Sequence, residues 1–378
     1  MSEDKAMSKK GRVYERNMSH RFQSPNWVFR TREGVGREQM KSKYDFGSIA
    51  GNVHIDRPLT DMSLKYRNGT MIADSICPRV PVKNITDEYF IYGRDDFEIV
   101  KDERADTAEA NFVNPLSITT DNYRCKEHNQ ADRIGDNERE NADPPLSPDI
   151  DRQENLTNRI MLNREKRCAD LLTPLASWLT VDPVTSTVGG VDVLASGGAT
   201  KQWDYVSGAT TFNSDDPLWN IEAMVDHAKQ AILNNIGKDP NVIIIPRPIS
   251  RVMKKDTRVR SQIQYTHADI LTDGELPDQL WNLQVFEPSA IYNTAERGQS
   301  FSGTNIWGNN IIVMYLAESP RQIKTMSATM TMQYKPRFVK KWREEWRQSD
   351  AIQVAEYVTE KIISGYCGYV IKNPIGSF

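Results

Sequence analysis

The sequence contains little cysteine and no long apolar run. Only four of its 378 residues are cysteines, and they are scattered without a Cys-x-x-Cys pair. Zinc sites need closely spaced thiolate or imidazole ligands, so we interpret the four as reduced, structural thiols of a cytosolic protein. The longest apolar stretches fall far short of the ~20 residues that a membrane-spanning helix requires. The polar segment Met1–Lys5 leads into no apolar run, and we do not expect a signal peptide.

A net charge of strong sign is also missing. Lysine and arginine number 48 and aspartate and glutamate 51, which gives a formal net charge of −3. Dedicated sequence-independent nucleic-acid binders carry a clear basic excess, so this composition argues against that class. Hydrophobic residues make up 38% of the chain, which favours a globular protein over a disordered one. The length suggests about two to three domains at ~150 residues each.

Contiguous catalytic motifs are missing as well. Asp239 follows Gly237-Lys238 where a phosphate-binding loop needs Ser or Thr, and Gly34–Gly36 lacks the third glycine of a dinucleotide-binding turn. The five histidines lie far apart in the sequence, so no HExxH zinc motif occurs. Acid pairs such as Asp95-Asp96 leave open an enzyme with scattered acid/base residues, but charged surface positions explain them more simply. We therefore expect no enzyme, no cofactor and no metal.

What the chain does contain begins with a basic arm. The first fifty residues hold eleven lysines and arginines against six aspartates and glutamates, with few apolar residues in a regular period. Such a segment cannot bury enough surface to fold alone, so we expect it either to stay mobile or to lie across a neighbouring molecule. Aromatic residues such as Trp27 and Phe29 favour the neighbour. Contact between this arm and nucleic acid is a weaker alternative.

A strand-rich acidic stretch follows the arm. Residues Tyr89–Tyr92, Phe97–Val100 and Leu116–Tyr123 predict strands from their β-branched and aromatic content. From Thr86 to Glu109 there are nine acidic residues against three basic ones. A long hairpin with a charged tip fits this pattern. Because an isolated two-stranded hairpin is marginal in water, we expect it to rest on another surface. An ordinary surface hairpin is the alternative.

Ser147-Pro148 predicts the start of a long helix. Ser147 suits the capping position and Pro148 the first helical position. The helix should run to Thr173, before Pro174, which gives roughly 25 residues and a length of about 38 Å. The charged run Arg164–Arg167 is expected on the polar side. The apolar residues at roughly helical spacing are Ile150, Ile160, Met161, Cys168, Leu171 and Leu172.

The middle of the chain predicts a compact α/β lobe. Val181–Thr211 is rich in glycine, serine and threonine and is typical of loops with short strands. A helix should begin at Asp216-Pro217, because apolar residues then recur every three or four positions, and Gly237 should end it. Buried strands are expected at Val242–Ile245, Leu283–Phe286 and Ile311–Leu316.

The C-terminal part is rich in β-branched and aromatic residues. Phe338, Trp342 and Trp346 are spaced four apart, which suits either one helix face or one strand face, and we interpret the region as strands. From Gln333 to Arg347 there are six basic residues against two acidic ones, so this region is locally basic. The three expected strand segments are Thr325–Tyr334, Arg337–Arg347 and Ala351–Ile363.

Several short motifs, in this order of parts, resemble one known family. The motifs are Tyr89–Phe97, Asp102–Ala105, Tyr123–His128, Glu138–Leu146, Leu162–Leu171, Asn305–Gly308, Trp342–Glu345 and Gly368–Lys372. Together with the sequence arm, hairpin, long helix, lobe and strands, they resemble the tailed-bacteriophage major capsid (major head) proteins with the Hong Kong 97-type fold. The resemblance covers most of the chain from about Ile72 onward and is weakest before it.

The resemblance implies an α+β fold with four parts. Residues 1–80 would be an N-terminal arm and 84–127 an extended loop, built as a long β-hairpin that crosses a neighbouring subunit. Residues 128–182 and 318–378 would form a peripheral domain with β-strands and a spine helix at about 148–173. Residues 183–317 would form the α/β axial domain at the centre of each pentamer or hexamer.

The function that the resemblance implies is that of a structural protein of the virion. Such a major capsid protein self-assembles as pentamers and hexamers into the icosahedral shell around the phage double-stranded DNA genome. The expected partners are further copies of itself, portal and scaffold proteins and an optional cement protein, with only weak, non-specific contact to packaged DNA and none to membranes. Assembly would take place in the host bacterial cytoplasm. The alternatives are an encapsulin-like nanocompartment shell and an accessory cement or tail protein.

The candidate functional residues are therefore subunit contacts rather than a catalytic site. Opposite charges on the acidic hairpin and on the arm or C-terminal strands should set the register between subunits. Aromatic residues should supply more of the adhesion, since single exposed ion pairs contribute only about 0–1 kcal/mol. The subunit-interface candidates are Trp27, Phe29, Phe97, Lys101, Asp102, Glu103, Arg104, Glu109, Lys340, Lys341 and Arg343.

Overall fold

The computed structural model describes fourteen stretches of the chain. They are residues 68–92, 99, 102–106, 109–112, 118–142, 147–183, 185–198, 202–204, 220–256, 259, 261, 276–296, 298–318 and 326–376. The chain divides into two units, Met1–Arg57 and Pro58–Phe378, and all described residues belong to the second. Most of the expected N-terminal arm, with Trp27 and Phe29, lies outside them, as do Phe97 and Lys101.

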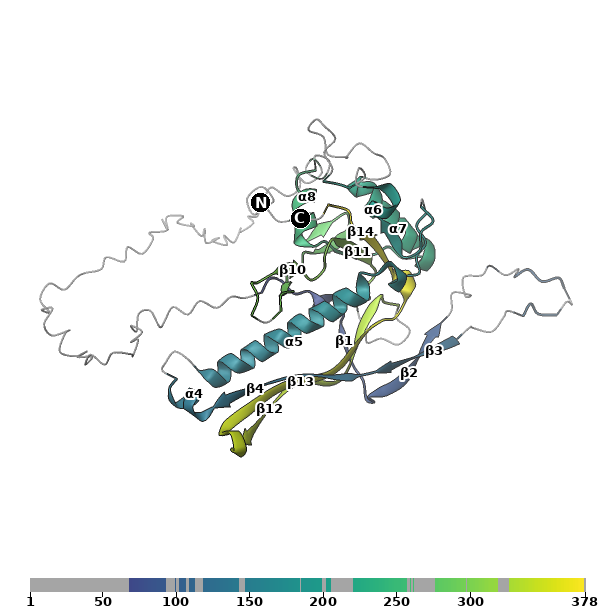
Figure 1. The fold of residues 1–378 in the computed structure, drawn as a ribbon. Helices are drawn as coiled ribbons and strands as arrows, with labels where there is room; N and C mark the ends of the chain where they lie inside the picture. The colour runs from purple at the N-terminus through teal and green to yellow at the C-terminus, as the bar shows by residue number, and fades with distance from the viewer. Residues whose placement is uncertain are drawn as a thin grey trace, which may run out of the picture. The chain divides into compact units, whose positions relative to one another are not determined.

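A four-stranded sheet forms one layer of the fold (Figure 1). Its order is β1 (Arg79–Pro81), β12 (Thr329–Glu344), β13 (Ser349–Ile362) and β4 (Lys126–Gly135). β12 pairs antiparallel with β13, and β13 with β4, while β1 joins β12 in parallel. The interpretation of the C-terminal region as strands is confirmed, although two expected segments merge into the single strand β12.

The long helix α5 (Pro148–Leu172) lies across this sheet (Figure 1). Leu156 and Ile160 of the helix pack against Ile134, Ile352 and Val354 of the strands, and all five are buried. The predicted helix and its length are confirmed, with the proline at the first helical position. The expected capping by the Ser147 side chain is wrong, because its hydroxyl makes no capping hydrogen bond.

The expected polar side of α5 is wrong at two positions. Arg164 and Glu165 are only 1% and 0% exposed, whereas Ile150, predicted to face the core, is 59% exposed. The reason is the segment that contains α3 (Ala73–Ile76), which packs on α5. Its backbone N–H groups at Ile72 and Ala73 donate to the Glu165 carboxylate, and Arg164 donates to the Cys77 carbonyl, so both charged side chains point inward here.

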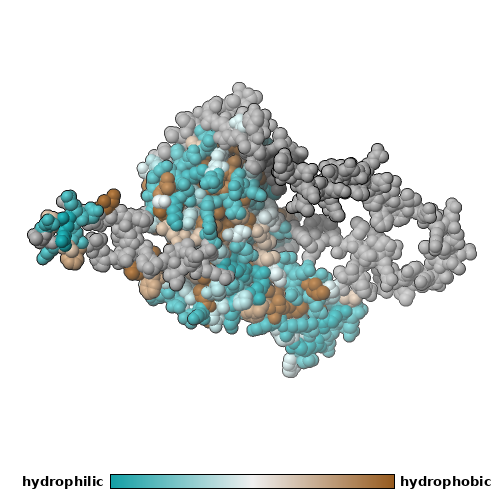
Figure 2. Space-filling view, turned by 180° about the vertical axis from the view of Figure 1, so that it is seen from behind, coloured by the Kyte–Doolittle hydropathy of each residue, from teal (hydrophilic) through white to brown (hydrophobic). Residues whose placement is uncertain are grey.

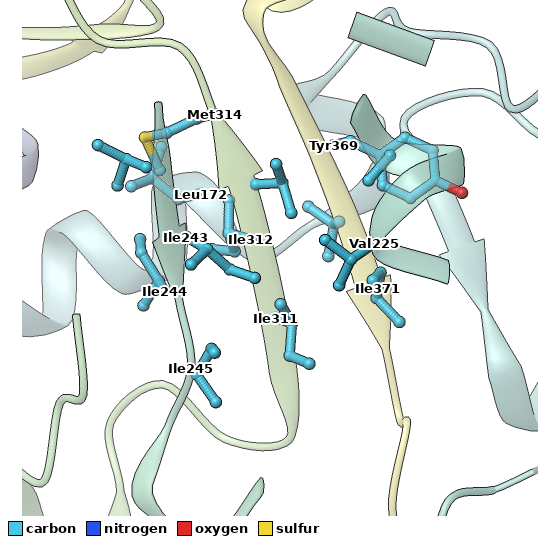
Figure 3. Close-up of a cluster of buried hydrophobic side chains, with 14 of the residues drawn as sticks. Leu172, Val225, Ile243, Ile244, Ile245, Ile311, Ile312, Met314, Tyr369 and Ile371 are labelled. Atoms are coloured by element: carbon cyan, nitrogen blue, oxygen red, sulfur yellow. The ribbon is translucent and has the colours of Figure 1, made fainter. Parts of the chain in front are cut away.

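A six-stranded sheet forms the core of the lobe. Its order is β5 (Gly190–Asp192), β14 (Gly368–Lys372), β11 (Asn310–Met314), β6 (Val242–Ile244), β8 (Leu283–Phe286) and β7 (Gln279–Leu280). The central strands of this sheet are covered on both faces, and such strands have continuous apolar runs in their sequences. Figure 3 shows Ile243 of β6 and Ile312 of β11 side by side in this core, with Ile371 of β14 beyond them.

Helix α7 (Ile221–Ile236) packs against β11 and β14 (Figure 1). It begins five residues later than Asp216, because the Asn220 side chain accepts the N–H of Ala223 at 2.7 Å and caps it there. Gly237 ends it in the left-handed conformation, with φ 67°, as predicted. The lobe also contains α6 (Val193–Gly197), α8 (Arg247–Met253) and a hairpin of β9 (Ile291–Asn293) and β10 (Gly303–Asn305).

The last strand departs from the boundary expected from the sequence. The resemblance groups residues 318–378 with the long C-terminal strands, but β14 leaves them and pairs antiparallel with β11 and parallel with β5. Val370 and Ile371 are fully buried there. A strand whose central residues are apolar and buried on both faces fits a sheet covered on both sides, and the lobe supplies that sheet.

The expected hairpin is present at its base. β2 (Thr86–Tyr92) and β3 (Ile118–Arg124) pair antiparallel along their whole length. Except for Ile99, the strand predicted at Phe97–Val100 lies outside the described residues. β4 follows β3 after one residue and is succeeded by the short helix α4 (Asp136–Glu140). Among the described helices, none combines the length and apolarity needed for a membrane crossing.

Candidate subunit interface

Polar and aromatic contacts anchor the base of the β2–β3 hairpin to the four-stranded sheet. The Tyr89 hydroxyl donates to the Asp121 carboxylate at 2.6 Å, and Lys361 of β13 forms an ion pair with the same carboxylate. The Lys361 ammonium also lies 5.2 Å from the centre of the Tyr89 ring. Hydrogen bonds from Lys361 and Tyr89 lower the pKa of Asp121, while burial and the Asp121 contact raise the pKa of Tyr89. The hairpin therefore leaves the subunit from a fixed base.

Beyond this base the hairpin exposes large apolar side chains. Phe90 on β2 is 69% exposed and Ile118 on β3 is 50% exposed. Further along, Ile99 and Phe112 are 99% and 88% exposed. Figure 2 shows hydrophobic atoms beside hydrophilic ones among the described residues at the left edge of the view. Fully burying one such side chain stabilises by about 1.5–3 kcal/mol, so these residues are suited to contact with another surface.

The charged candidates of the hairpin tip are exposed as expected. Asp102, Glu103, Arg104 and Glu109 all lie on the surface. The Asn111 side-chain amide donates a hydrogen bond to the Glu103 backbone carbonyl at 3.2 Å. The role of these residues in subunit contact stays a prediction.

The three basic candidates on β12 divide into two groups. Lys341 donates to Asp149 at 2.9 Å, and the Arg343 guanidinium donates to both Asp136 oxygens at 2.5 and 2.6 Å. The Asp149 hydrogen bond raises the pKa of Lys341. The sequence does not reveal these pairs, because α4 and the start of α5 are about two hundred residues away. Lys340 points to the other face, where its ammonium lies 5.2 Å from the Phe338 ring centre.

A buried carboxylate ties three parts of the chain together. Glu165 of α5 accepts the backbone N–H groups of Ile72 and Ala73 at 3.0 and 2.8 Å. It also accepts the indole N–H of Trp307 at 2.7 Å. Composition and spacing gave no sign of this contact. Both side chains do fall within motifs that carry the family resemblance, Leu162–Leu171 and Asn305–Gly308.

A second buried carboxylate gathers arginines under α5. Glu356 of β13 is fully buried, and its oxygens lie 3.4 Å from Arg79, 3.3 Å from Arg337 and 3.9 Å from Arg167. Arg167 also reaches Glu360 at 2.9 Å. These contacts join β1, the bent part of β12 and the helix. They hold these three elements in place relative to one another.

The described residues show no metal-binding arrangement. No group of three or more histidine, cysteine, aspartate or glutamate side chains stands close enough there to hold a metal ion. All four cysteines are described, and all are buried free thiols, in agreement with their structural interpretation.

Comparison with known proteins points to one class. No family model matches the chain. It is 28% identical to the major capsid protein of Burkholderia phage BcepMu over 264 residues, which cover 69% of this chain and 76% of that protein. It is 26% identical to the major capsid protein of Pseudomonas phage JBD67 over 269 residues, which cover 69% and 77%. The capsid structure of cyanophage P-SCSP1u superposes with a TM-score of 0.56 at 11% identity, covering 88% of this chain and 93% of that one.

The fold defined by these likenesses is the Hong Kong 97-type capsid fold, an α+β arrangement. The expected fold class is confirmed. Together with this fold, the two sequence relatives make the chain similar to phage major capsid proteins and support a shell-forming function.

Proposed function

We propose that this protein assembles as pentamers and hexamers into the icosahedral shell that encloses the double-stranded DNA genome of a phage. The observation that carries the proposal is the β2–β3 hairpin, which keeps Phe90 and Ile118 exposed although its base is fixed. A two-stranded hairpin is marginal by itself, so a neighbouring subunit that covers these side chains stabilises both molecules. The contact is heterologous, and heterologous contacts close into rings when the rotation permits.

Many modest contacts suit such a lattice better than one strong contact. Misplaced subunits then dissociate, while a closed shell is stabilised because each further contact forms at high effective concentration. The acidic tip with Asp102, Glu103 and Glu109 faces solvent and can guide the hairpin to a basic neighbour. Lys341 and Arg343 are already paired within the subunit, so they contribute less to such guidance than the sequence suggests.

The domain assignment follows the two sheets. We assign the six-stranded lobe, including β14, to the axial domain, and α5 with the four-stranded sheet to the peripheral domain. The net charge of −3 is consistent with weak, non-specific contact to DNA that is brought in by a motor. Portal, scaffold and optional cement proteins complete the set of proposed partners. The proposal places assembly in the host bacterial cytoplasm.

Electron microscopy of the expressed protein tests the proposal. The full chain is expressed alone and together with the neighbouring head genes of its genome, and the products are examined by negative stain and sedimentation. Closed shells or capsomer rings support the proposal. Monodisperse monomers or dimers under both conditions would overturn it. Particles from infected cells should protect DNA against nuclease, whereas shells that hold an enzyme and no DNA would identify a nanocompartment.

A further inference from the structure

One edge of β12 has no described partner strand over much of its length. β1 covers this edge only from Thr331 to Gln333, and β13 lies on the opposite side. From Lys335 to Glu344 no strand of the described residues pairs with the edge. Figure 1 shows β12 on the outer side of β13, away from β4. An uncovered edge of this length is a template for pairing with another strand.

The backbone of β12 presents its hydrogen-bonding groups in a defined phase. In an antiparallel pair, alternate residues turn their N–H and C=O groups toward the partner strand. Ile363 donates to Ala328 at 2.9 Å, which shows that odd-numbered residues of β13 turn toward β12. Ala351, which pairs with Trp342, therefore does so as well. Trp342 consequently turns its backbone N–H and C=O toward β13, and Lys341 turns its backbone N–H and C=O toward the free edge.

Apolar side chains gather at the same edge. Trp342 is 40% exposed, Val339 is 44% exposed and Trp346, in the turn after β12, is 101% exposed. By contrast, Trp178 and Trp307 are 0% and 2% exposed. Tryptophan is a frequent anchor of protein interfaces, where its large ring is desolvated. The edge is therefore suited to burial by a partner.

The charges that normally protect an edge strand are largely neutralised here. Lysine on an edge discourages unwanted pairing. Lys341, however, lies 2.9 and 3.4 Å from Asp149 and Asp350, and Arg343 is paired with Asp136. Both belong to the face that packs on α5. The other face carries Lys340 and Glu344, which have opposite charges; Glu344 also pairs with Arg133 and Arg347 of its own chain at 2.8 and 3.5 Å.

We propose that β12 pairs with β12 of a second copy, antiparallel, about a two-fold axis at Trp342. Each residue then lies opposite the residue equally far from Trp342 in the other direction, so that the numbers of an opposed pair sum to 684. Trp342 therefore faces Trp342 of the second copy, and Lys340 faces Glu344 of the second copy. The turn that carries Trp346 comes alongside Phe338 of the second copy. Opposite charges and aromatic pairs directly across a strand pair are stabilising. The pairing is isologous and joins the two four-stranded sheets into one.

Neighbouring registers fit less well. An axis at Lys340 sets that lysine directly against its own copy, and like charges opposite one another are destabilising. An axis at Lys341 sets Trp342 opposite Lys340 of the second copy, so the tryptophan pair is lost. An axis at Arg343 sets Trp342 opposite Glu344 of the second copy and loses the tryptophan pair in the same way. The register at Trp342 leaves Lys341 opposite Arg343 of the second copy, and the aspartates of each chain neutralise that pair.

Cross-linking by cysteine tests this register. The inference deepens the proposed shell function, since it names a contact between neighbouring subunits. Two residues that face each other across the new strand pair, with their backbone N–H and C=O groups turned away from it, have Cα atoms about 4.5 Å apart. This distance is within the range of a disulfide. Trp342→Cys in the full chain, oxidised by dioxygen, should therefore shift most of the protein to twice the monomer mass on a non-reducing gel. The four native cysteines are buried and should give little background.

Lys340→Cys is the matched control on the same strand and face. In the proposed register, the two copies of this cysteine lie about 13 Å apart and should not cross-link. Lys340→Cys combined with Glu344→Cys places two opposed pairs and should cross-link, even if loss of Trp342 itself impairs assembly. Dimers from the control that equal those from Trp342→Cys, or no dimers from the double variant, would overturn the register.

The shell proposal and the pairing can fail separately. Shells in the microscope without any cross-link from Trp342→Cys or from the double variant would refute the pairing and leave the shell function standing. Absence of shells from the unmodified chain under all expression conditions would refute the shell proposal. Cross-linked dimers in that case would still support the pairing.

Discussion

The indole N–H of Trp307 donates to the Glu165 carboxylate across 2.7 Å, and both side chains are buried. The contact links the lobe to the middle of α5, and the same carboxylate accepts two backbone N–H groups at the start of α3. One side chain thus fixes three segments that are far apart in the sequence. Buried charges are tolerated only where hydrogen bonds satisfy them, as they do here.

Glu165→Ala should strongly destabilise the subunit. It leaves three buried N–H donors without an acceptor, and each unsatisfied group costs about 1–3 kcal/mol. Glu165→Gln keeps one acceptor oxygen and should lose less. Urea unfolding of the soluble subunit measures both. Asp170→Asn on the exposed side of the same helix is the control and should change the free energy of unfolding by less than about 0.5 kcal/mol. Equal stability of Glu165→Ala and the control would contradict this role.

The sequence predicts the bounds of α5 well, but it does not predict that the charged residues Arg164 and Glu165 are buried. Ser147-Pro148 and Pro174 bracket the helix because proline acts locally on the backbone. Arg164 and Glu165 look like surface residues, since their partners are supplied by segments around residues 72–77 and 331, far along the chain. Local patterns carry no information about such pairings.

The candidate interface was predictable to a similar extent. Exposure of the charged hairpin tip follows from its composition. The pairing of Lys341 and Arg343 with aspartates of the same chain does not, because it depends on how α4, α5 and β13 meet. The free edge of β12 was also hidden, since it results from the shortness of β1.

His128 should make the subunit less stable in mild acid. Burial, together with the nearby Arg167, lowers the pKa of His128 below its usual 6.5, while Glu360 and Glu356 oppose this shift. The unfolded chain therefore binds a proton more readily, and the stability present above about pH 6.5 is lost as the pH falls toward the lowered pKa.

His128→Asn removes this dependence. Unfolding in urea at pH 7.5 and pH 5.5 should show a smaller loss of stability for the variant than for the unmodified protein. An identical pH dependence of His128→Asn and the unmodified protein would count against the prediction.

Glu356→Gln should destabilise the subunit, whereas high salt should leave the unmodified subunit nearly as stable. The substitution leaves Arg79 and Arg337 without the charge of their buried partner, and removing one side of a buried ion pair costs about 3–5 kcal/mol. Salt screens buried pairs much less than exposed ones. Raising the ionic strength should therefore leave the unmodified subunit nearly as stable, while Glu356→Gln unfolds at markedly lower urea. A variant as stable as the unmodified protein would refute the role of Glu356.

Phe90→Ser should weaken the shell and spare the subunit. Phe90 is 69% exposed in the subunit, so its removal costs little stability there. Where a neighbouring subunit covers Phe90, each contact between subunits loses about 1.5–3 kcal/mol of stabilisation. Deletion of residues 101–111 should act in the same direction. Sedimentation and negative stain should show fewer or no closed shells, with unchanged urea unfolding of the soluble subunit. Ile160→Ala is the opposite control: Ile160 of α5 is buried against the four-stranded sheet, so the substitution should lower subunit stability by about 2–5 kcal/mol. Phe90→Ser subunits that unfold early would instead place Phe90 in the core of its own chain.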